Sequence, residues 1–344
     1  MTAAPTRSPV LRWLKRIGLG LVGLLVLAVT VGAGYEALAR RRAAREHPPA
    51  GTLVDIGGRR IHLDCRGTGA PTVVFEAGLD INGSLSWTTV HDSIAAGTRA
   101  CAYDRAGVMW SDPKDGPQNA VTVAEDLHAT LAAAGEAGPF VLVGHSLGGP
   151  YIMTYTKKYG DQVAGLVFVD ASHPEQETRF AEVIKKPMTP STAGIKAAAA
   201  LAWTGLIRVA LPAEGAPNVP DMVTKKMNAY ASTSLPGMLA ESDALGATLA
   251  EAGTFRTLGD RPLVVLTAMA PLPDAALKTL DLSKEDGDRF QAVWKTLHEE
   301  EASWSTRSRH QLVPDASHYI QFDRPDLVIA AVREVVELVR QGPK

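Results

Sequence analysis

The chain has 344 residues, of which 46% are hydrophobic and 21% are charged, a composition typical of a globular protein with one large domain and a short appendage. The net charge is −2, but the first 46 residues hold eight cationic and two anionic side chains, so residues 47–344 carry −8. An acidic body without a basic stripe excludes nucleic acid as an expected partner, because phosphate binding needs clustered Lys and Arg.

The first element is an uncharged apolar segment of 19 residues, 17–35, which follows a basic segment, residues 1–16. As a helix it is about long enough to cross the ~30 Å hydrocarbon core of a bilayer. Residues 17–39 are therefore predicted to be either a permanent signal anchor or a signal peptide cleaved at a small-x-small site ending at Ala39. The length of the apolar run favours the anchor.

Cations flank this segment on both sides, so the positive-inside rule leaves its orientation open. A single N-terminal anchor usually exports the domain that follows it. We therefore expect a membrane-anchored protein whose C-terminal domain is exported, or a secreted protein if the segment is cleaved. Residues 40–51 are predicted to be a linker, because they are polar and contain two prolines.

Eight short β-rich runs follow residue 52. The first two flank Gly57-Gly58 and predict a hairpin. The next four are nearly continuous apolar runs, as in buried parallel strands. A helix is predicted over residues 122–134, opened by a capping box at Thr122, and the last helix is expected to begin near Pro325. The runs are residues 52–56, 59–65, 72–78, 99–104, 139–144, 164–170, 262–267 and 309–314.

This alternation predicts an α/β fold with a mostly parallel eight-stranded sheet and helices on both faces. Residues 172–260 break the alternation with helical patterns and no strand-like run. We expect them to form a helical cap over the carboxyl edge of the sheet, where open α/β sheets bind ligands. The core is accordingly predicted in two parts, residues 52–171 and 261–344.

The most informative motif is Gly144-His145-Ser146-Leu147-Gly148, between an apolar strand and a helical run. A G-x-S-x-G pattern in a strand–turn–helix context predicts a sharp turn that holds a nucleophilic serine above the sheet. The glycines leave room for neighbouring backbone to approach closely. Ser146 is therefore the predicted nucleophile.

A serine hydroxyl is a weak nucleophile unless a base accepts its proton. Of the nine histidines, His318 is the best candidate, because it lies in a loop just after the last predicted strand. Two carboxylates could orient it, and both follow Ser146 and precede His318 in the chain. Asp170 ends a predicted strand, whereas Asp274 is displaced from its strand by several residues. We favour Asp170 and keep Asp274 as the alternative acid.

A tetrahedral intermediate carries a negative oxygen that needs preset donors. One expected donor is the backbone N–H of Leu147, the residue after the nucleophile. The other is expected from Leu79, in the loop after the run at 72–78.

The two cysteines, Cys65 and Cys101, show neither C-x-x-C spacing nor a zinc pattern. We favour two buried thiols at strand positions, with a disulfide as the alternative.

Together these motifs resemble the α/β-hydrolase superfamily from about residue 52 to residue 339. The loop after the first apolar run has Ala77-Gly78 where the family usually has His-Gly. The resemblance implies a Ser–His–acid triad, with the acid of some members at the position of Asp170. The matching stretches are TVVFEAGLDINGSLSW, the D-R-x-G-x-x-x-S stretch at Asp104, Arg105, Gly107 and Ser111, VGHSLGGPY, and SHYIQFDRPDLV.

The predicted function is hydrolysis of a carboxylic ester, esterase- or lipase-like, through an acyl-enzyme on Ser146. The same residues could serve amide, lactone, carbon–carbon bond or perhydrolase chemistry, and a non-catalytic membrane-tethered scaffold is a third hypothesis. The expected partners are a small apolar ester and, through the N-terminal helix, a membrane. Neither a metal nor a cofactor is expected, because the sequence contains no motif for one. The sequence does not indicate the oligomeric state.

Overall fold

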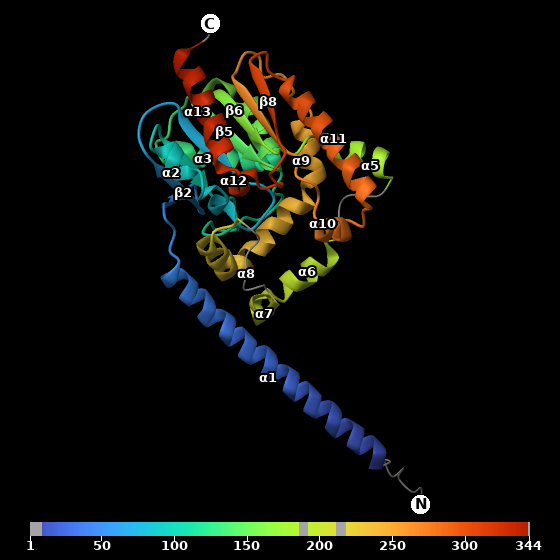
Figure 1. Ribbon diagram of the computed structural model, residues 1–344. Helices are drawn as coiled ribbons and strands as arrows, with labels where there is room; N and C mark the ends of the chain where they lie inside the picture. Colours follow the sequence, from blue (N-terminus) through green and yellow to red (C-terminus); the bar gives the residue numbers. More distant parts are fainter. Residues whose placement is uncertain (1–8, 186–191, 211–217, 343–344) are drawn as a thin grey trace, which may run out of the picture.

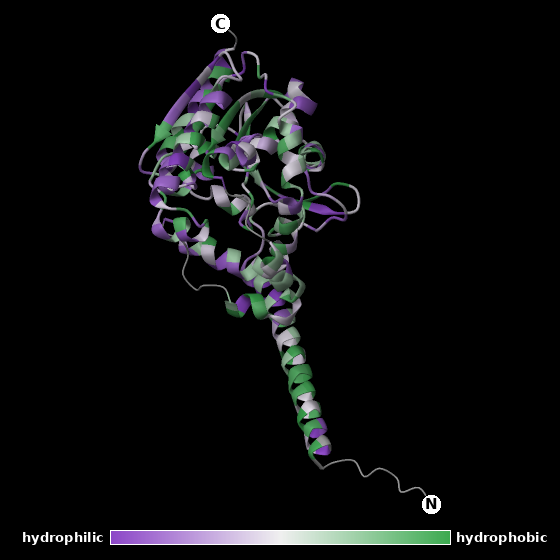
Figure 2. Cartoon of the chain, turned by 90° about the vertical axis from the view of Figure 1, so that its right-hand side faces the viewer, coloured by the Kyte–Doolittle hydropathy of each residue, from purple (hydrophilic) through white to green (hydrophobic). Residues whose placement is uncertain are grey.

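A computed structural model describes residues 9–185, 192–210 and 218–342 (Figure 1). One long helix, α1 (Pro9–Glu46), projects from a body that holds the other elements. Hydrophobic residues line much of its length (Figure 2), and by length and composition it could cross a membrane. The helix extends through Glu46, so the first half of the expected linker, residues 40–46, is helical.

The body is built on one sheet of eight strands in the order β1-β2-β4-β3-β5-β6-β7-β8. The β1–β2 and β2–β4 pairs are antiparallel, and all other pairs are parallel. The predicted fold class is therefore confirmed. The strands are β1 (Thr52–Asp55), β2 (Arg60–Arg66), β3 (Thr72–Glu76), β4 (Ala100–Tyr103), β5 (Phe140–His145), β6 (Val163–Val169), β7 (Leu263–Ala268) and β8 (Ser308–Val313).

Both faces of the sheet are covered by helices (Figure 1). In β5, Leu142 faces the core that α3 and α4 complete, whereas Val141 and Val143 face the core that α2 and α13 complete. Burial on both faces explains why this strand is a continuous apolar run. The helices around the sheet are α2 (His91–Ala95), α3 (Ala120–Ala133), α4 (Gly148–Tyr159), α10 (Asp274–Thr279), α11 (Lys284–Ala302), α12 (Ile320–Asp323) and α13 (Pro325–Gln341).

The described residues between β6 and β7 contain helices and no strand, consistent with the helical insert expected over residues 172–260. Several of these helices lie on the same side of the body as α1 (Figure 1). We propose this insert as the cap. Its helices are α5 (Gln176–Ile184), α6 (Ala193–Ala200), the 3₁₀ helix η3 (Ala202–Thr204), α7 (Leu206–Ala210), α8 (Asp221–Asp243) and α9 (Leu245–Ala252).

The order of the sheet determines which loops meet. In the parallel register, His145 at the end of β5 lies opposite Val169 at the end of β6. The next residues along the chain are Ser146 and Asp170, so these two residues emerge side by side at the carboxyl edge. The chain after β8, which contains His318, leaves the same edge, because β8 is parallel to β7.

The start of α3 differs from the prediction. The helix begins at Ala120, and its N-cap is Asn119, whose side chain accepts a hydrogen bond from the Thr122 N–H. The expected capping box at Thr122 was therefore wrong: Asn119, with an extended backbone, caps one turn earlier. The last helix does begin at Pro325, as expected.

The expectation of two free thiols was also wrong, because Cys65 and Cys101 form a disulfide. The two residues are direct register partners in the antiparallel β2–β4 pair, with their Cα atoms 4.0 Å apart. Their pairing depends on the strand register, which the spacing of the cysteines alone does not reveal. A disulfide is typical of proteins that fold in an oxidising compartment.

Replacing both cysteines by serine is expected to lower the free energy of unfolding by about 2–4 kcal/mol, because the unfolded chain gains freedom when the loop is opened. Urea unfolding of the full-length protein in detergent would measure this change. Reductant should produce a similar loss in the wild type and no further loss in the variant. Equal unfolding midpoints for the two proteins would contradict the expectation.

Candidate active site

Ser146 lies in the turn between β5 and α4 with a left-handed backbone, φ 52°. Glycines occupy the positions where the turn leaves no room for a side chain. A Cβ at Gly144 would lie 2.7 Å from the Gly148 carbonyl oxygen. A Cβ at Gly148 would lie 2.5 Å from the carbonyl oxygen of Glu76. Both glycines are therefore required by close backbone contacts, as the elbow motif predicts.

His318 lies in the loop after β8, and its imidazole is partly exposed. Its Nδ1 is 2.6 Å from Oδ2 of Asp170. An ionised carboxylate only accepts hydrogen bonds, so Nδ1 carries the proton and Nε2 is left as the basic nitrogen. The backbone carbonyl of His318 accepts a hydrogen bond of 2.9 Å from His145 Nε2.

Asp170 is buried at the tip of β6, also with a left-handed backbone, φ 45°. Its Oδ1 accepts hydrogen bonds from the Ala268 N–H (2.8 Å) and from Trp294 Nε1 (2.9 Å). Burial by itself raises the pKa of this carboxyl, but the hydrogen bond from His318, with its charge, and the Ala268 N–H outweigh burial and lower the pKa. The carboxylate is therefore fixed in place and ionised.

Asp274 does not take part in this arrangement. It is the exposed first residue of α10, where a carboxylate interacts favourably with the helix dipole. His318 Nδ1 is instead occupied by Asp170. The geometry thus favours Asp170 over the alternative acid.

The two expected backbone donors, Leu79 and Leu147, lie close together. Their side chains pack in one apolar cluster between the elbow, α3 and α9. The loop after β3 runs against the elbow, since a Cβ at Gly78 would lie 2.9 Å from Cβ of Ser146. Within the described chain, neither the Leu79 N–H nor the Leu147 N–H donates a hydrogen bond, so both remain available to a ligand oxygen.

A buried arginine, which the sequence indicated only as part of a family motif, holds this loop. The Arg105 guanidinium donates to the carbonyl oxygens of Ala77 and Gly78, each at 2.7 Å. It also forms ion pairs of 2.7 Å with Glu76 and with Glu241 of α8. Arg105 therefore joins β3, the loop after it and the cap.

This contact orients the Leu79 N–H. In a trans peptide the C=O and N–H bonds point in opposite directions. Because the Gly78 carbonyl points at Arg105, the N–H of Leu79, in the same peptide unit, points away from Arg105.

Replacing Arg105 by lysine is expected to lower kcat for an ester by about 10²-fold, because an ammonium cannot hold both carbonyls and both carboxylates in one plane. Initial rates and thermal unfolding, measured together, separate this effect from a loss of stability. Arg99→Lys is the matched control, since Arg99 pairs with Glu136 at the other end of β4. An unchanged kcat in the Arg105 variant would contradict the assignment.

His145 supports His318 and does not compete with it for the serine proton. Burial, aided by the charge of His318, lowers the pKa of His145 to about 3, so the ring is neutral. Its Nε2–H donates to the His318 carbonyl, which positions the loop that carries the base.

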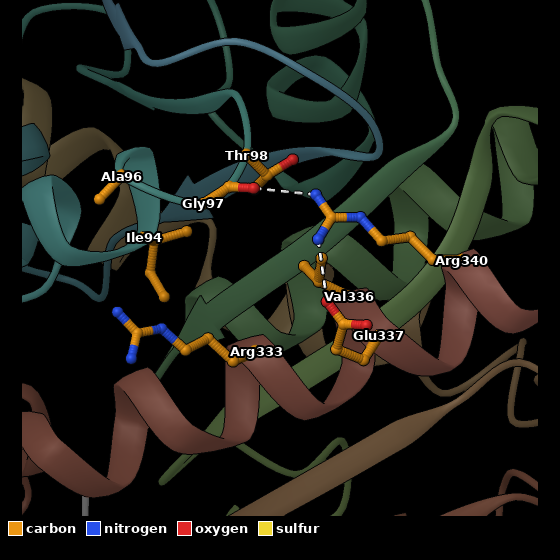
Figure 3. A pocket seen from close by; sticks show the side chains of 8 residues that line it. All are labelled: Ile94, Ala96, Gly97, Thr98, Arg333, Val336, Glu337 and Arg340. Atoms are coloured by element: carbon orange, nitrogen blue, oxygen red, sulfur yellow. Dashed lines mark hydrogen bonds and ion pairs between the residues drawn. The ribbon is translucent and has the colours of Figure 1, made fainter.

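A surface cavity of about 310 Å³ lies between α2 and α13 (Figure 3). Its lining includes Thr98, which precedes β4, and Arg340, which donates to the Gly97 carbonyl. Residues that precede a parallel strand lie at the end of the sheet opposite the carboxyl edge. This cavity is therefore remote from Ser146.

Comparison with solved structures finds proteins of similar fold. A thermophilic esterase from Thermogutta terrifontis superposes with a TM-score of 0.55, at 21% identity over 83% of this chain and 97% of the esterase. An epoxide hydrolase from Bacillus megaterium gives a TM-score of 0.59, at 16% identity over 83% of this chain and 100% of that chain. At these identities the likeness is one of fold.

The matches to curated sequence relatives cover smaller shares of those proteins. A probable transporter, efuK, from Hormonema carpetanum is 35% identical over 130 residues, 35% of this chain and 18% of the relative. An AB hydrolase superfamily protein from Gibberella zeae is 23% identical over 297 residues, 78% of this chain and 87% of the relative. The matches to the first three curated relatives span only 18%, 26% and 52% of those proteins. The model of the alpha/beta hydrolase family matches residues 65–331, and the chain therefore belongs to this family.

Proposed function

We propose that the protein is a serine hydrolase that cleaves a carboxylic ester through an acyl-enzyme on Ser146. The observation that carries the proposal is the 2.6 Å contact between His318 and Asp170, at the edge of the sheet where the strained elbow presents Ser146.

In the acylation step, His318 Nε2 accepts the proton of the Ser146 hydroxyl while Oγ attacks the ester carbonyl. Asp170 holds Nδ1–H and stabilises the imidazolium that forms. The backbone N–H groups of Leu79 and Leu147 stabilise the oxyanion. His318 then gives its proton to the leaving alkoxide, and an alcohol departs.

In the second step, His318 removes a proton from water, which attacks the acyl-enzyme carbonyl. Collapse of the second tetrahedral intermediate returns the proton to Ser146 and releases the carboxylic acid. Amide, lactone, carbon–carbon bond and perhydrolase chemistry would use the same residues, so the choice of ester rests on substrate tests.

Release of p-nitrophenol from acetate, butyrate and octanoate esters by the full-length protein in detergent tests this proposal. We expect turnover of the esters and far slower turnover of the matching p-nitroanilide. A higher kcat/KM for the anilide or for a lactone would mean that the site serves amide or lactone hydrolysis instead of ester hydrolysis. A folded protein that hydrolyses none of them would contradict the proposal.

We also propose that α1 is a retained membrane anchor. Glu36 of α1 is buried against the body, where it pairs with Arg208 of α7 at 2.6 Å and accepts a hydrogen bond of 2.6 Å from Ser232 of α8. Cleavage after Ala39 would remove Glu36 and leave Arg208, whose side chain is only 9% exposed, without this carboxylate. The disulfide supports an exported domain, since such bonds persist in oxidising compartments.

A further inference from the structure

The described part of the cap carries exposed apolar side chains that no other element covers. Five large hydrophobic side chains on or between α6, η3 and α7 are between 45% and 79% exposed, and we call them the cap patch. Within the described part of the chain, five of the eight large exposed hydrophobic residues outside α1 belong to it. Exposed apolar side chains gathered on neighbouring elements favour an interaction surface, whereas exposed residues scattered singly do not. The cap patch consists of Ile195, Leu201, Trp203, Leu206 and Val209.

The cap patch lies beside α1. A Cβ at Gly32 would lie 2.3 Å from the carbonyl oxygen of Thr204, and a Cβ at Gly205 would lie 3.0 Å from the ring of Tyr35. The backbone that carries Trp203 and Leu206 is therefore in contact with the last turn of the apolar run. Figure 2 shows hydrophobic segments of the body gathered where α1 reaches it.

The length of the apolar run determines the depth of this contact. Its 19 residues rise by about 28 Å as a helix, and the hydrocarbon core is about 30 Å thick. A spanning helix therefore needs the whole run, including residues 32–35. Because η3 is level with that last turn, it must lie at the boundary of the hydrocarbon core.

The arginines that follow the contact between α1 and η3 are consistent with η3 lying at the boundary of the hydrocarbon core. Arg40, Arg41 and Arg42 follow Glu36 by four to six residues, or about 6–9 Å along the helix. The polar layer on each side of the core is about 5–8 Å thick, so this part of α1 lies at the level of the lipid phosphates. Within α1, Arg40 pairs with Glu36 and Arg42 pairs with Glu46. Trp203 lies at the depth where aromatic side chains are enriched in membrane proteins.

We propose that the cap patch enters the interfacial layer of the same bilayer that α1 spans, so that the lipid surface is its partner. This inference rests on the proposed anchor. The Glu36–Arg208 ion pair fixes the cap to α1 at this depth, because Glu36 is buried and the side chain of Arg208 is only 9% exposed. The cap over the carboxyl edge of the sheet then lies directly on lipid.

Spin labels on single introduced cysteines in the full-length protein, reconstituted in phosphatidylcholine–phosphatidylglycerol vesicles, test this inference. The native cysteines are joined in a disulfide, so each new thiol is labelled alone. Leu206→Cys reports on the cap patch, and Leu312→Cys, on a similarly exposed leucine of β8, is the matched control. Leu24→Cys, near the centre of the apolar run, calibrates the hydrocarbon core.

We expect oxygen to relax the Leu206 label more strongly than a water-soluble nickel chelate does, and the reverse at Leu312. The Leu24 label should be the deepest. A Leu206 label as accessible to nickel as the Leu312 label would overturn the inference, and so would a Leu24 label in water. Val209→Cys repeats the test if Leu206→Cys unfolds. The readout does not use ester hydrolysis, so failure of the proposed activity remains distinguishable.

Discussion

Replacing Ser146 by alanine is expected to lower kcat for p-nitrophenyl butyrate by about 10⁶-fold, while the protein stays folded. Alanine removes the only atom that can form the acyl-enzyme, and His318 and Asp170 then have no proton to move. The backbone donors Leu79 and Leu147 remain, so a rate somewhat above that of water should persist.

Initial rates at saturating ester, with purified wild-type and variant proteins, measure this loss. Ser93→Ala is the matched control, because Ser93 lies on α2, against the face of the sheet opposite α3 and α4. Its kcat should stay within about twofold of the wild type. If Ser146→Ala kept more than a few per cent of the activity, Ser146 would not be the nucleophile.

The second large effect is expected from Asp170→Asn, which should lower kcat by about 10⁴-fold. An amide at this position can donate to Nδ1 of His318 and so favour the tautomer that has no free base at Nε2. Asp274→Asn, at the exposed start of α10, should leave kcat within about twofold. Equal, small losses in the two variants would refute the choice of acid.

The same two variants should also differ in how strongly their stability depends on pH. The pKa of Asp170 is lowered in the folded protein, so its ionised form stabilises the fold above the unfolded pKa of about 3.9. That contribution is lost as the pH falls through the lower, folded value. Thermal unfolding between about pH 2 and pH 5 should therefore depend less on pH in Asp170→Asn than in the wild type or Asp274→Asn.

The strands and the elbow were predictable from the sequence because both depend on local patterns. A strand buried on both faces is largely apolar, as residues 140–144 of β5 and all of β6 are. The elbow needs small residues at fixed offsets from Ser146, and Asp170 was favoured because it directly ends a strand. These features can be predicted from one sequence because residues close together in the chain determine them.

The features that were missed depend on residues far apart in the chain. The disulfide joins Cys65 to Cys101 through the register of β2 and β4. The ion pair of Arg105 with Glu241 spans 136 positions and depends on how α8 packs over the site. Similarly, the buried Glu36 has its partners on α7 and α8, and nothing near it in the sequence indicates that contact.

Ser146 is tested most directly as the nucleophile by labelling the full-length protein with a fluorophosphonate, followed by mass spectrometry of the modified peptide. We expect one adduct, on Ser146, that forms rapidly in the wild type and far more slowly in Asp170→Asn and His318→Ala. An adduct on another serine, or none in a folded protein, would contradict the assignment of Ser146 as an activated nucleophile.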